Sequence, residues 1–514
     1  MKKIITLFAL LLLLTSCSKD VKETSEDIPV EEVTEINLDA PFVASYSMGI
    51  SDFRPYTYMH HEGKAILQNI HEGLYKIDED GNLKPGIANG ITVSEEDGYL
   101  VYRIVLRDGV KFHNGEELTP EDVQYSIFRY TGLIPGIDTA NMENSKYWKN
   151  MVNGMTSDGF KKGKVEILGT SEIVLYLDDY YGEEVTSSIL ADTFIVPQGY
   201  TEEDQGKFPI GLGPYMFVEM DAHSTIKLTR FEDYYTKKPQ IKNIEIANIP
   251  LKEDRITNFT NGSLHLIDSY PVLSGEEDLD NLSTDIYSLV FNVDDPVFSN
   301  IELREALYSG VDKNKIKEDV LAFSGAVVET PLSPYFSPYL EGLEIEKSYN
   351  PERSRELIAK NPEFKEEFFS IAYIEEDFLS QAIGEFVRYD LLTLDLQVEL
   401  LPLPYEDFQK FILEDKAYGM AIVRFTGNHD PYRIMNRFTT RTRLNISDFY
   451  QLDYNTFLTD DRNNYQGMFD MIKRDYPELY LVDPGTSFKI NENFTGPKYY
   501  PYPYWDFSSI KYAK

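Results

Sequence analysis

Residues 99–130, YLVYRIVLRDGVKFHNGEELTPEDVQYSIFRY, contain a strand signal, two turn signals and a helix start in one uninterrupted stretch. Apolar residues alternate with their neighbours from Leu100 to Leu106, which predicts a β-strand that buries one face. The dipeptides Asp-Gly at 108–109 and Asn-Gly at 114–115 predict tight turns, because glycine accepts the positive φ that such turns need. The stretch therefore predicts a strand followed by two turns and a helix.

The predicted helix begins at the tetrapeptide TPED, residues 119–122. Threonine suits the N-cap, proline suits the first helical position, and acids suit the positive end of a helix. His113 stands just before the second turn, with no second histidine nearby. Because a metal site needs two or three ligands at helix or hairpin spacing, we interpret His113 and the surrounding carboxylates as structural. A metal or acid–base site is the alternative.

The composition describes a large acidic globular chain. Its 514 residues are 42% hydrophobic, which is enough for two or three domains with sizeable cores. The formal net charge is -37, so nucleic acids and anionic lipid surfaces would be repelled. No nucleic-acid partner is expected.

Residues 1–16, MKKIITLFALLLLLTS, have the pattern of an export signal. Two lysines precede an apolar run that is too short to span a bilayer as a helix. The run ends in Leu-Thr-Ser-Cys, which resembles a bacterial lipobox, and Cys17 is the only cysteine in the chain. The pattern predicts export, a lipid anchor on Cys17 at the cell membrane (extracellular face or periplasm), and no disulfides. The alternative is a free thiol in an ordinary signal peptide.

Residues 17–37 are predicted to be the lipidated cysteine followed by a disordered acidic tether, because this segment has many acids and no long apolar run. The alternative is a frayed edge of the first domain.

Five segments together resemble one protein family. The segment LRDGVKFHNGEELTPEDVQYSIFRY, 106–130, is similar to the signature of the peptide- and nickel-type extracellular solute-binding proteins of bacterial ABC transporters. Four others are similar to further elements of that family, and they lie at 69–98, 211–220, 259–268 and 289–316. The resemblance covers about residues 40–500, nearly the whole chain beyond the export signal.

The resemblance implies an α/β chain with the two-lobe fold of the large class II periplasmic binding proteins. Lobe I is expected at 38–286, with an inserted subdomain at about 55–190. Lobe II is expected at 287–480, and the segment 481–514 is expected to return to lobe I. Alternating helix and strand signals between 299 and 425 support an α/β lobe II.

The resemblance also implies a function. The chain is expected to capture an oligopeptide-like solute in a cleft between the lobes and to deliver it to an ABC permease and its ATPase subunits. The family further implies a monomer. The alternatives are the same fold with a non-peptide solute, namely a nickel chelate, haem or an oligosaccharide, and a surface sensor or receptor without transport.

The family places the main ligand-facing strand of lobe II at 422–433, IVRFTGNHDPYR, and the first cleft strand of lobe I at 47–50, SMGI. Peptide binders of the family often carry an aspartate for the ligand's amino terminus where this chain has Gly427, and a tryptophan where it has Arg424. Arg424 would either bind a ligand carboxylate or phosphate or lie on a solvated rim. The expected ligand-binding residues are Met48, Arg424, Phe425, Thr426, Gly427 and Asp430.

Two of these residues keep an alternative role. Asp430 would either partly replace the missing aspartate or serve the loop as a structural acid before proline, and Met48 would either contact ligand or belong to the core.

No catalytic residue, metal site or cofactor is expected, and the chain is not predicted to be an enzyme. It has no GxSxG or HExxH motif and no cysteine nucleophile. With few histidines, direct capture of a transition metal is disfavoured, and the pair at 60–61 is the one place to check for it.

Overall fold

The computed structural model describes residues 39–55, 61–78, 82–139, 142, 144–153, 155–156, 159–160, 164–178, 181–268, 282–321, 325–425, 427, 430–438, 445–447, 449, 465–485, 488–497, 500 and 505–513. The predictions for the export signal, Cys17 and the tether lie outside these residues. Within them, no helix combines the length and apolarity needed to cross a membrane.

The strand and helix predicted from the signature segment are confirmed. Strand β5 (Tyr99–Leu106) is followed by turns in which Gly109 and Gly115 have φ of 69° and 89°. Helix α2 (Pro120–Thr131) then begins with a capping box, in which the Thr119 hydroxyl accepts from the Asp122 amide while the Asp122 carboxylate accepts from the Thr119 amide. This reciprocal pairing satisfies amide groups that the first helical turn leaves free.

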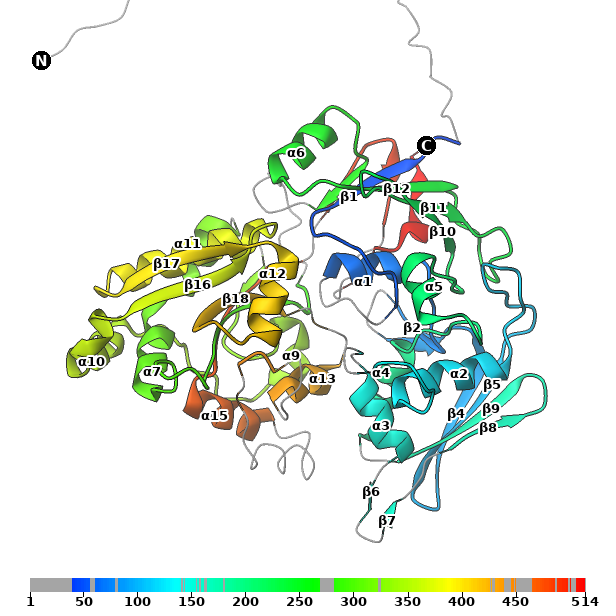
Figure 1. Ribbon diagram of the computed structural model, residues 1–514, viewed down its shortest axis with the longest axis horizontal. Coiled ribbons are helices and arrows are strands. Elements are labelled where there is room, and N and C mark those ends of the chain that lie inside the picture. Colours follow the sequence, from blue (N-terminus) through cyan, green and yellow to red (C-terminus); the bar gives the residue numbers. More distant parts are fainter. Residues whose placement is uncertain are drawn as a thin grey trace, which may run out of the picture. The chain divides into compact units, whose positions relative to one another are not determined.

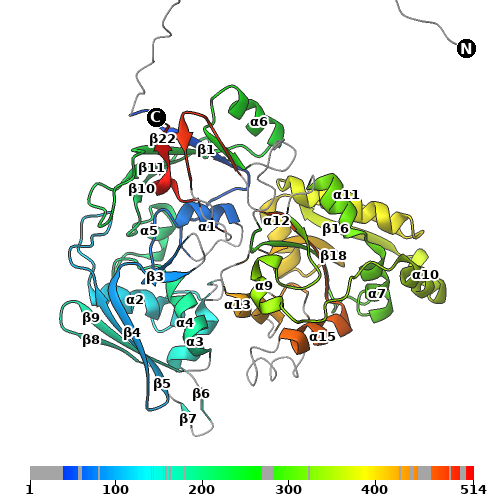
Figure 2. The ribbon, with the colours of Figure 1, turned by 180° about the vertical axis from the view of Figure 1, so that it is seen from behind.

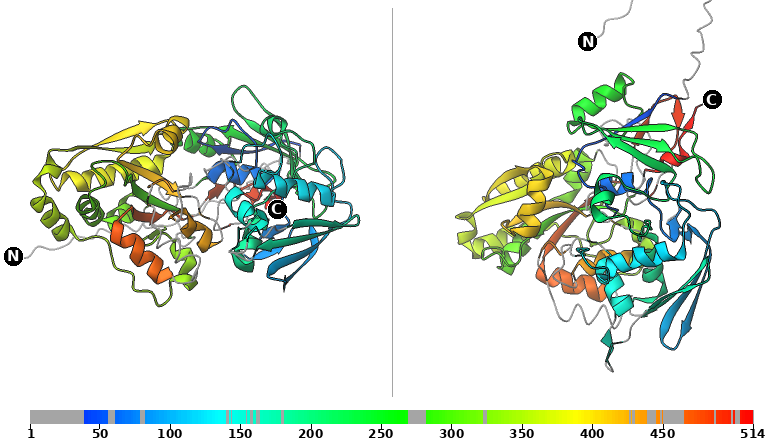
Figure 3. Two further views of the ribbon diagram at one scale, coloured as in Figure 1. Left: turned by 60° about the horizontal axis from the view of Figure 1, so that its bottom comes forward. Right: turned by 45° about the vertical axis from the view of Figure 1, so that its right-hand side comes forward.

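Lobe I contains two four-stranded sheets. The first has the order β1-β12-β11-β10, and the second has the order β4-β5-β9-β8 with every pair antiparallel. Figure 3 shows helices α2, α3 and α4, in cyan to green, beside the second sheet. The bounds are β1 (Phe42–Tyr46), β12 (Asn243–Asn248), β11 (Ile226–Arg230), β10 (Tyr215–Met220), β4 (Ala88–Glu96), β9 (Glu172–Asp178), β8 (Lys164–Leu168), α3 (Ser145–Asn153) and α4 (Gly182–Ala191).

The C-terminal residues pack on the first sheet of lobe I, as Figure 2 shows for β22 (Lys511–Tyr512). Strand β20 (Phe488–Ile490) pairs with β13 (Leu266–Asp268), and β22 pairs with β21 (Phe494–Thr495). The Asn69 side chain holds this end of the chain, because it donates to the Trp505 carbonyl and accepts from the Phe507 amide.

Lobe II is built on a six-stranded mixed sheet of order β15-β19-β14-β18-β16-β17. Helices α7, α10 and α11 surround it (Figure 1). The bounds are β15 (Ala326–Val327), β19 (Glu478–Asp483), β14 (Ile286–Phe291), β18 (Met420–Phe425), β16 (Phe368–Ile374), β17 (Gln397–Leu403), α7 (Ile301–Gly310), α10 (Pro351–Lys360) and α11 (Phe378–Leu392). A parallel β16–β17 pair joined by a helix is the ordinary α/β crossover unit.

Strands β14 and β19, which carry the chain into and out of lobe II, are antiparallel neighbours. At their lobe I end, the buried carboxylate of Asp483 accepts from the amide and hydroxyl of Ser283 and from the hydroxyl of Ser333. The two connections between the lobes are thus tied together. The numerical lobe boundaries given above stay a prediction.

The described chain contains further α-helices and strands. They are α1 (His61–Leu67), β2 (Tyr75–Ile77), β3 (Leu83–Pro85), β6 (Met155–Thr156), β7 (Gly159–Phe160), α5 (Glu202–Lys207), α6 (Lys252–Thr260), α8 (Lys313–Lys315), α9 (Ser337–Leu340), α12 (Tyr405–Gln409), α13 (Pro431–Met435) and α15 (Tyr465–Asp475).

Candidate functional site

The chain that leaves β1 is held by a buried carboxylate in the first turn of α1. Glu62 accepts hydrogen bonds from the amide of Ser47 at 3.0 Å, from its hydroxyl at 3.0 Å and from the amide of Met48 at 2.9 Å. Both partners and Glu62 itself are buried. The amides of Ser47 and Met48 are therefore already engaged within the protein.

The Met48 side chain is 4% exposed and packs into an apolar cluster of lobe II. That cluster includes Val423 of β18 and Phe408 of α12, and Phe425 packs against it. The structure thus brings two of the residues predicted for the site, Met48 and Phe425, into one apolar cluster. Met48 follows a strand of lobe I, so this packing joins the lobes.

Arg424 forms an ion pair with Asp285, the residue that precedes β14. The Arg424 Nε and one terminal guanidinium nitrogen both lie 2.8 Å from Asp285 Oδ2. The other carboxylate oxygen, Oδ1, accepts from the Gly427 amide at 2.9 Å. A single buried carboxylate therefore holds both Arg424 and Gly427, and the guanidinium is committed to it.

Gly427 lies against the backbone of Thr284. A Cβ atom at position 427 would come within 1.9 Å of the Thr284 carbonyl oxygen, far inside van der Waals contact. No side chain fits there unless the backbone moves. An aspartate at this position would therefore clash with the Thr284 backbone.

Phe425 lies under the guanidinium of Arg437, whose carbon is 4.0 Å from the ring centroid. Arg437 donates to Glu478 Oε2 at 3.0 Å, and both side chains are almost fully buried. Such a cation–π contact is favourable because the ring face carries partial negative charge. Glu478 of β19 thus holds Arg437 in place over the Phe425 ring.

Asp430 is buried and precedes α13 directly. Its carboxylate lies near Tyr465, whose pKa is raised first by burial and then by the charge of Asp430. Thr426 and His60 lie outside the described residues, as does the side chain of His61.

Sequence reasoning missed Glu62, Asp285 and Arg437, which hold the predicted residues in place. A usable signal existed for Asp285, since an acid directly precedes the strand signal at 286–291. Glu62 and Arg437 carry no comparable signal, and the partners of all three residues lie elsewhere in the sequence.

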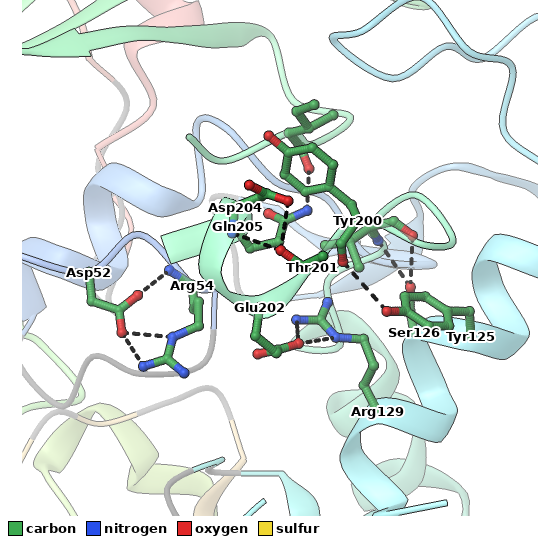
Figure 4. A network of polar contacts seen from close by, with 12 residues as sticks. Asp52, Arg54, Tyr125, Ser126, Arg129, Tyr200, Thr201, Glu202, Asp204 and Gln205 are labelled. Atoms are coloured by element: carbon green, nitrogen blue, oxygen red, sulfur yellow. Dashed lines mark hydrogen bonds and ion pairs between the residues drawn. The ribbon is translucent and has the colours of Figure 1, made fainter. Parts of the chain in front are cut away.

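A polar network also lies in lobe I (Figure 4). Asp52 accepts from the Arg54 Nε at 2.7 Å, and the buried Arg129 Nε donates to Glu202 Oε1 at 2.9 Å. The Phe53 amide donates to the Gly206 carbonyl at 3.0 Å, which ties this stretch to α5. The network supplies charged side chains and no paired nucleophile and base among the residues drawn.

His113 is engaged with backbone groups. Its Nε2 lies 3.0 Å from the Gly213 carbonyl oxygen, and its Nδ1 accepts from the Gly211 amide at 3.3 Å. This is the neutral tautomer with the proton on Nε2, and burial lowers the pKa of the ring to about 4. His113 therefore fastens the turn to the loop at 211–213. Among the described residues, no three histidine, cysteine or acidic side chains are grouped so as to hold a metal ion.

Two lobes are joined by the paired strands β14 and β19, and Met48 of lobe I packs against lobe II. This is the architecture of the two-lobe class of solute-binding proteins. Residues 82–445 match the family model described as bacterial extracellular solute-binding proteins, family 5 middle. The chain belongs to this family, and the predicted family and fold class are confirmed.

Relatives of known name cover most of the chain. The oligopeptide-binding protein AppA of Bacillus subtilis is 25% identical over an alignment of 493 positions, which covers 86% of this chain and 86% of that protein. The nickel-binding protein NikA of Staphylococcus aureus is 20% identical over an alignment of 510 positions, which covers 94% of this chain and 93% of that protein.

Solved structures show the same fold. The structure of Bacillus subtilis AppA in complex with a nonapeptide has a TM-score of 0.79 and 20% identity, and covers 92% of this chain and 99% of AppA. The structure of NikZ from Campylobacter jejuni in complex with Ni(L-His) has a TM-score of 0.77 and 20% identity, and covers 91% and 99%.

Proposed function

We propose that this protein captures an oligopeptide-like solute between its two lobes and delivers it to an ABC permease. The observation that carries the proposal is its similarity to AppA over 86% of both chains. The chain would hold the solute by contacts made only when the lobes close on it, and no bond would be broken. Export and anchoring through a lipid on Cys17 are part of the proposal.

The geometry bears on which part of a peptide is recognised. Extended peptides are often held by main-chain hydrogen bonds to an edge of the binding protein. Here the amides of Ser47 and Met48 are engaged by Glu62, and the Gly427 amide is engaged by Asp285. Arg424 is neutralised by Asp285. We therefore propose that the predicted residues shape an apolar contact through Met48 and Phe425, and that Gly427 supplies no charge to a free amino terminus.

The test is a thermal-shift screen of the purified protein with a peptide library in free and N-acetylated forms, combined with native mass spectrometry for co-purified solute. We expect peptides to raise the melting temperature, and blocked peptides to act about as well as free ones. Failure of every peptide in both measurements would contradict peptide capture. A strict requirement for a free amino terminus would contradict only the role given to Gly427.

A second candidate keeps the fold and changes the solute. Relatives include nickel-binding proteins and a heme-binding protein of Haemophilus influenzae that is 23% identical over 392 residues. The same screen with nickel plus L-histidine, with haem and with oligosaccharides distinguishes these solutes from peptides. A surface sensor without transport would bind solute but stimulate no ATP hydrolysis by a reconstituted permease.

A further inference from the structure

Two arginines one helical turn apart in the segment 431–438 have partners in different lobes. Arg437 donates to Glu478 at the start of β19, so it fastens the segment to the lobe II sheet. Arg433 donates instead to side chains of lobe I. The segment is thus anchored by one arginine and reaches across to the other lobe with the second.

The lobe I partners of Arg433 come from two helices. One guanidinium nitrogen donates to the Ser188 hydroxyl at 3.1 Å and also contacts the Asp192 carboxylate. The other terminal nitrogen donates to the Asn144 side-chain oxygen at 2.8 Å. Ser188 lies in α4, Asp192 caps its C-terminus, and Asn144 directly precedes α3.

The contact is buried on the arginine side and accessible on the carboxylate side. The side chain of Arg433 is 2% exposed, whereas that of Asp192 is 27% exposed. If the lobes parted, both charges would regain water, so neither would be left buried without a partner. An ion pair with this property resists opening without preventing it.

Neighbouring contacts also join segments of lobe II to helices of lobe I. The Tyr339 hydroxyl of α9 donates to Glu184 of α4 at 2.8 Å. Met435 and Phe438 are fully buried in an apolar cluster that also contains Trp148 of α3 and Leu190 of α4. The lobes therefore meet at α13 in a packed contact with Arg433 at its polar side.

We propose that Arg433 is a positioning residue that fastens the lobes in the arrangement in which α13 contacts α3 and α4, because its partners Ser188, Asp192 and Asn144 are groups of the protein itself. The Asp192, Ser188 and Asn144 contacts hold the arginine in one orientation. One consequence rests on the proposed function: if the protein binds a solute between its lobes, fastened lobes would release that solute more slowly. Charge-assisted hydrogen bonds of this kind change an equilibrium by about tenfold or more.

The test is a distance measurement between the lobes by double electron–electron resonance in solute-free protein. Nitroxides are placed at two exposed positions, Leu168→Cys in β8 and Tyr389→Cys in α11, with Cys17→Ser removing the native cysteine. Arg433→Gln and Asp192→Asn are compared with Arg388→Gln, whose partner Glu385 lies in the same helix.

We expect the parent to show mainly one short distance. In Arg433→Gln and in Asp192→Asn, a longer distance should be populated about tenfold more than in the parent. The Arg433→Gln/Asp192→Asn double variant should open no further than either single variant, and Arg388→Gln should match the parent. Identical distance distributions in the parent and the two single variants, with unchanged melting temperatures, would overturn the proposal. If the variants have lower melting temperatures, the distance distribution of Arg433→Lys is measured as well. Partial recovery of the short distance in Arg433→Lys supports the proposal, and no recovery overturns it.

Discussion

A Cβ atom on Gly427 would lie 1.9 Å from the Thr284 carbonyl oxygen, so the loop after β18 and the connection before β14 touch backbone to backbone. The contact lies beside the Asp285 carboxylate, which binds the Gly427 amide and the Arg424 guanidinium. The loop that resembles the family's ligand-facing strand is therefore locked to one of the connections between the lobes.

Gly427→Ala should destabilise the protein by about 2 kcal/mol, because overpacking against backbone forces the chain to shift. Urea unfolding followed by circular dichroism measures the change. Gly49→Ala is the matched control, since nothing lies within 4 Å of a Cβ added there. Equal free energies of unfolding for the two variants would show that the loop moves freely.

Asp285→Asn should destabilise the protein by about 2 kcal/mol, because Arg424 would keep a mostly buried charge without its counterion. The Gly427 amide would retain an acceptor in the asparagine oxygen, so the loss reports on the ion pair. The control is Glu232→Gln, whose side chain is 57% exposed beside Arg230, so water screens that pair and its loss should matter less. A loss no larger than the control's would mean that Arg424 is hydrated.

Arg437→Met should cost about 3 kcal/mol of stability, because it leaves the Glu478 carboxylate buried and unpaired. Adding Glu478→Leu to that variant should restore most of the loss, since the pair is then replaced by apolar side chains. Chemical unfolding of the two single variants and the double variant gives the coupling. Additive losses would contradict a direct pair.

His113 predicts acid sensitivity between about pH 6.5 and pH 4. Burial lowers its folded-state pKa to about 4, whereas the unfolded ring titrates near the usual value of about 6.5. In this window the unfolded chain binds one proton more than the folded chain, so stability falls as the pH falls, by about 3 kcal/mol in total.

The free energy of unfolding measured at pH 7 and pH 4.5 tests this. In His113→Gln, part of the acid-dependent loss should disappear. In His223→Gln, which changes an exposed histidine, the loss should match the parent. Buried His71, whose pKa burial also lowers, contributes in the same direction and explains a residual loss. An unchanged pH dependence in His113→Gln would show that the pKa of this ring is the same in the folded and the unfolded protein.

Local patterns in the sequence determined the strand at 99–106, the two glycine turns and the capped start of α2, because each depends on residues only a few positions apart. The ordered set of motifs also determined the family and its two-lobe fold. Only the tertiary structure decided the roles of Arg424, Gly427 and Met48. Their partners Asp285, Thr284 and the lobe II cluster are distant in sequence, and burial, which decides whether a charge is free or paired, is set by the packing of the whole chain.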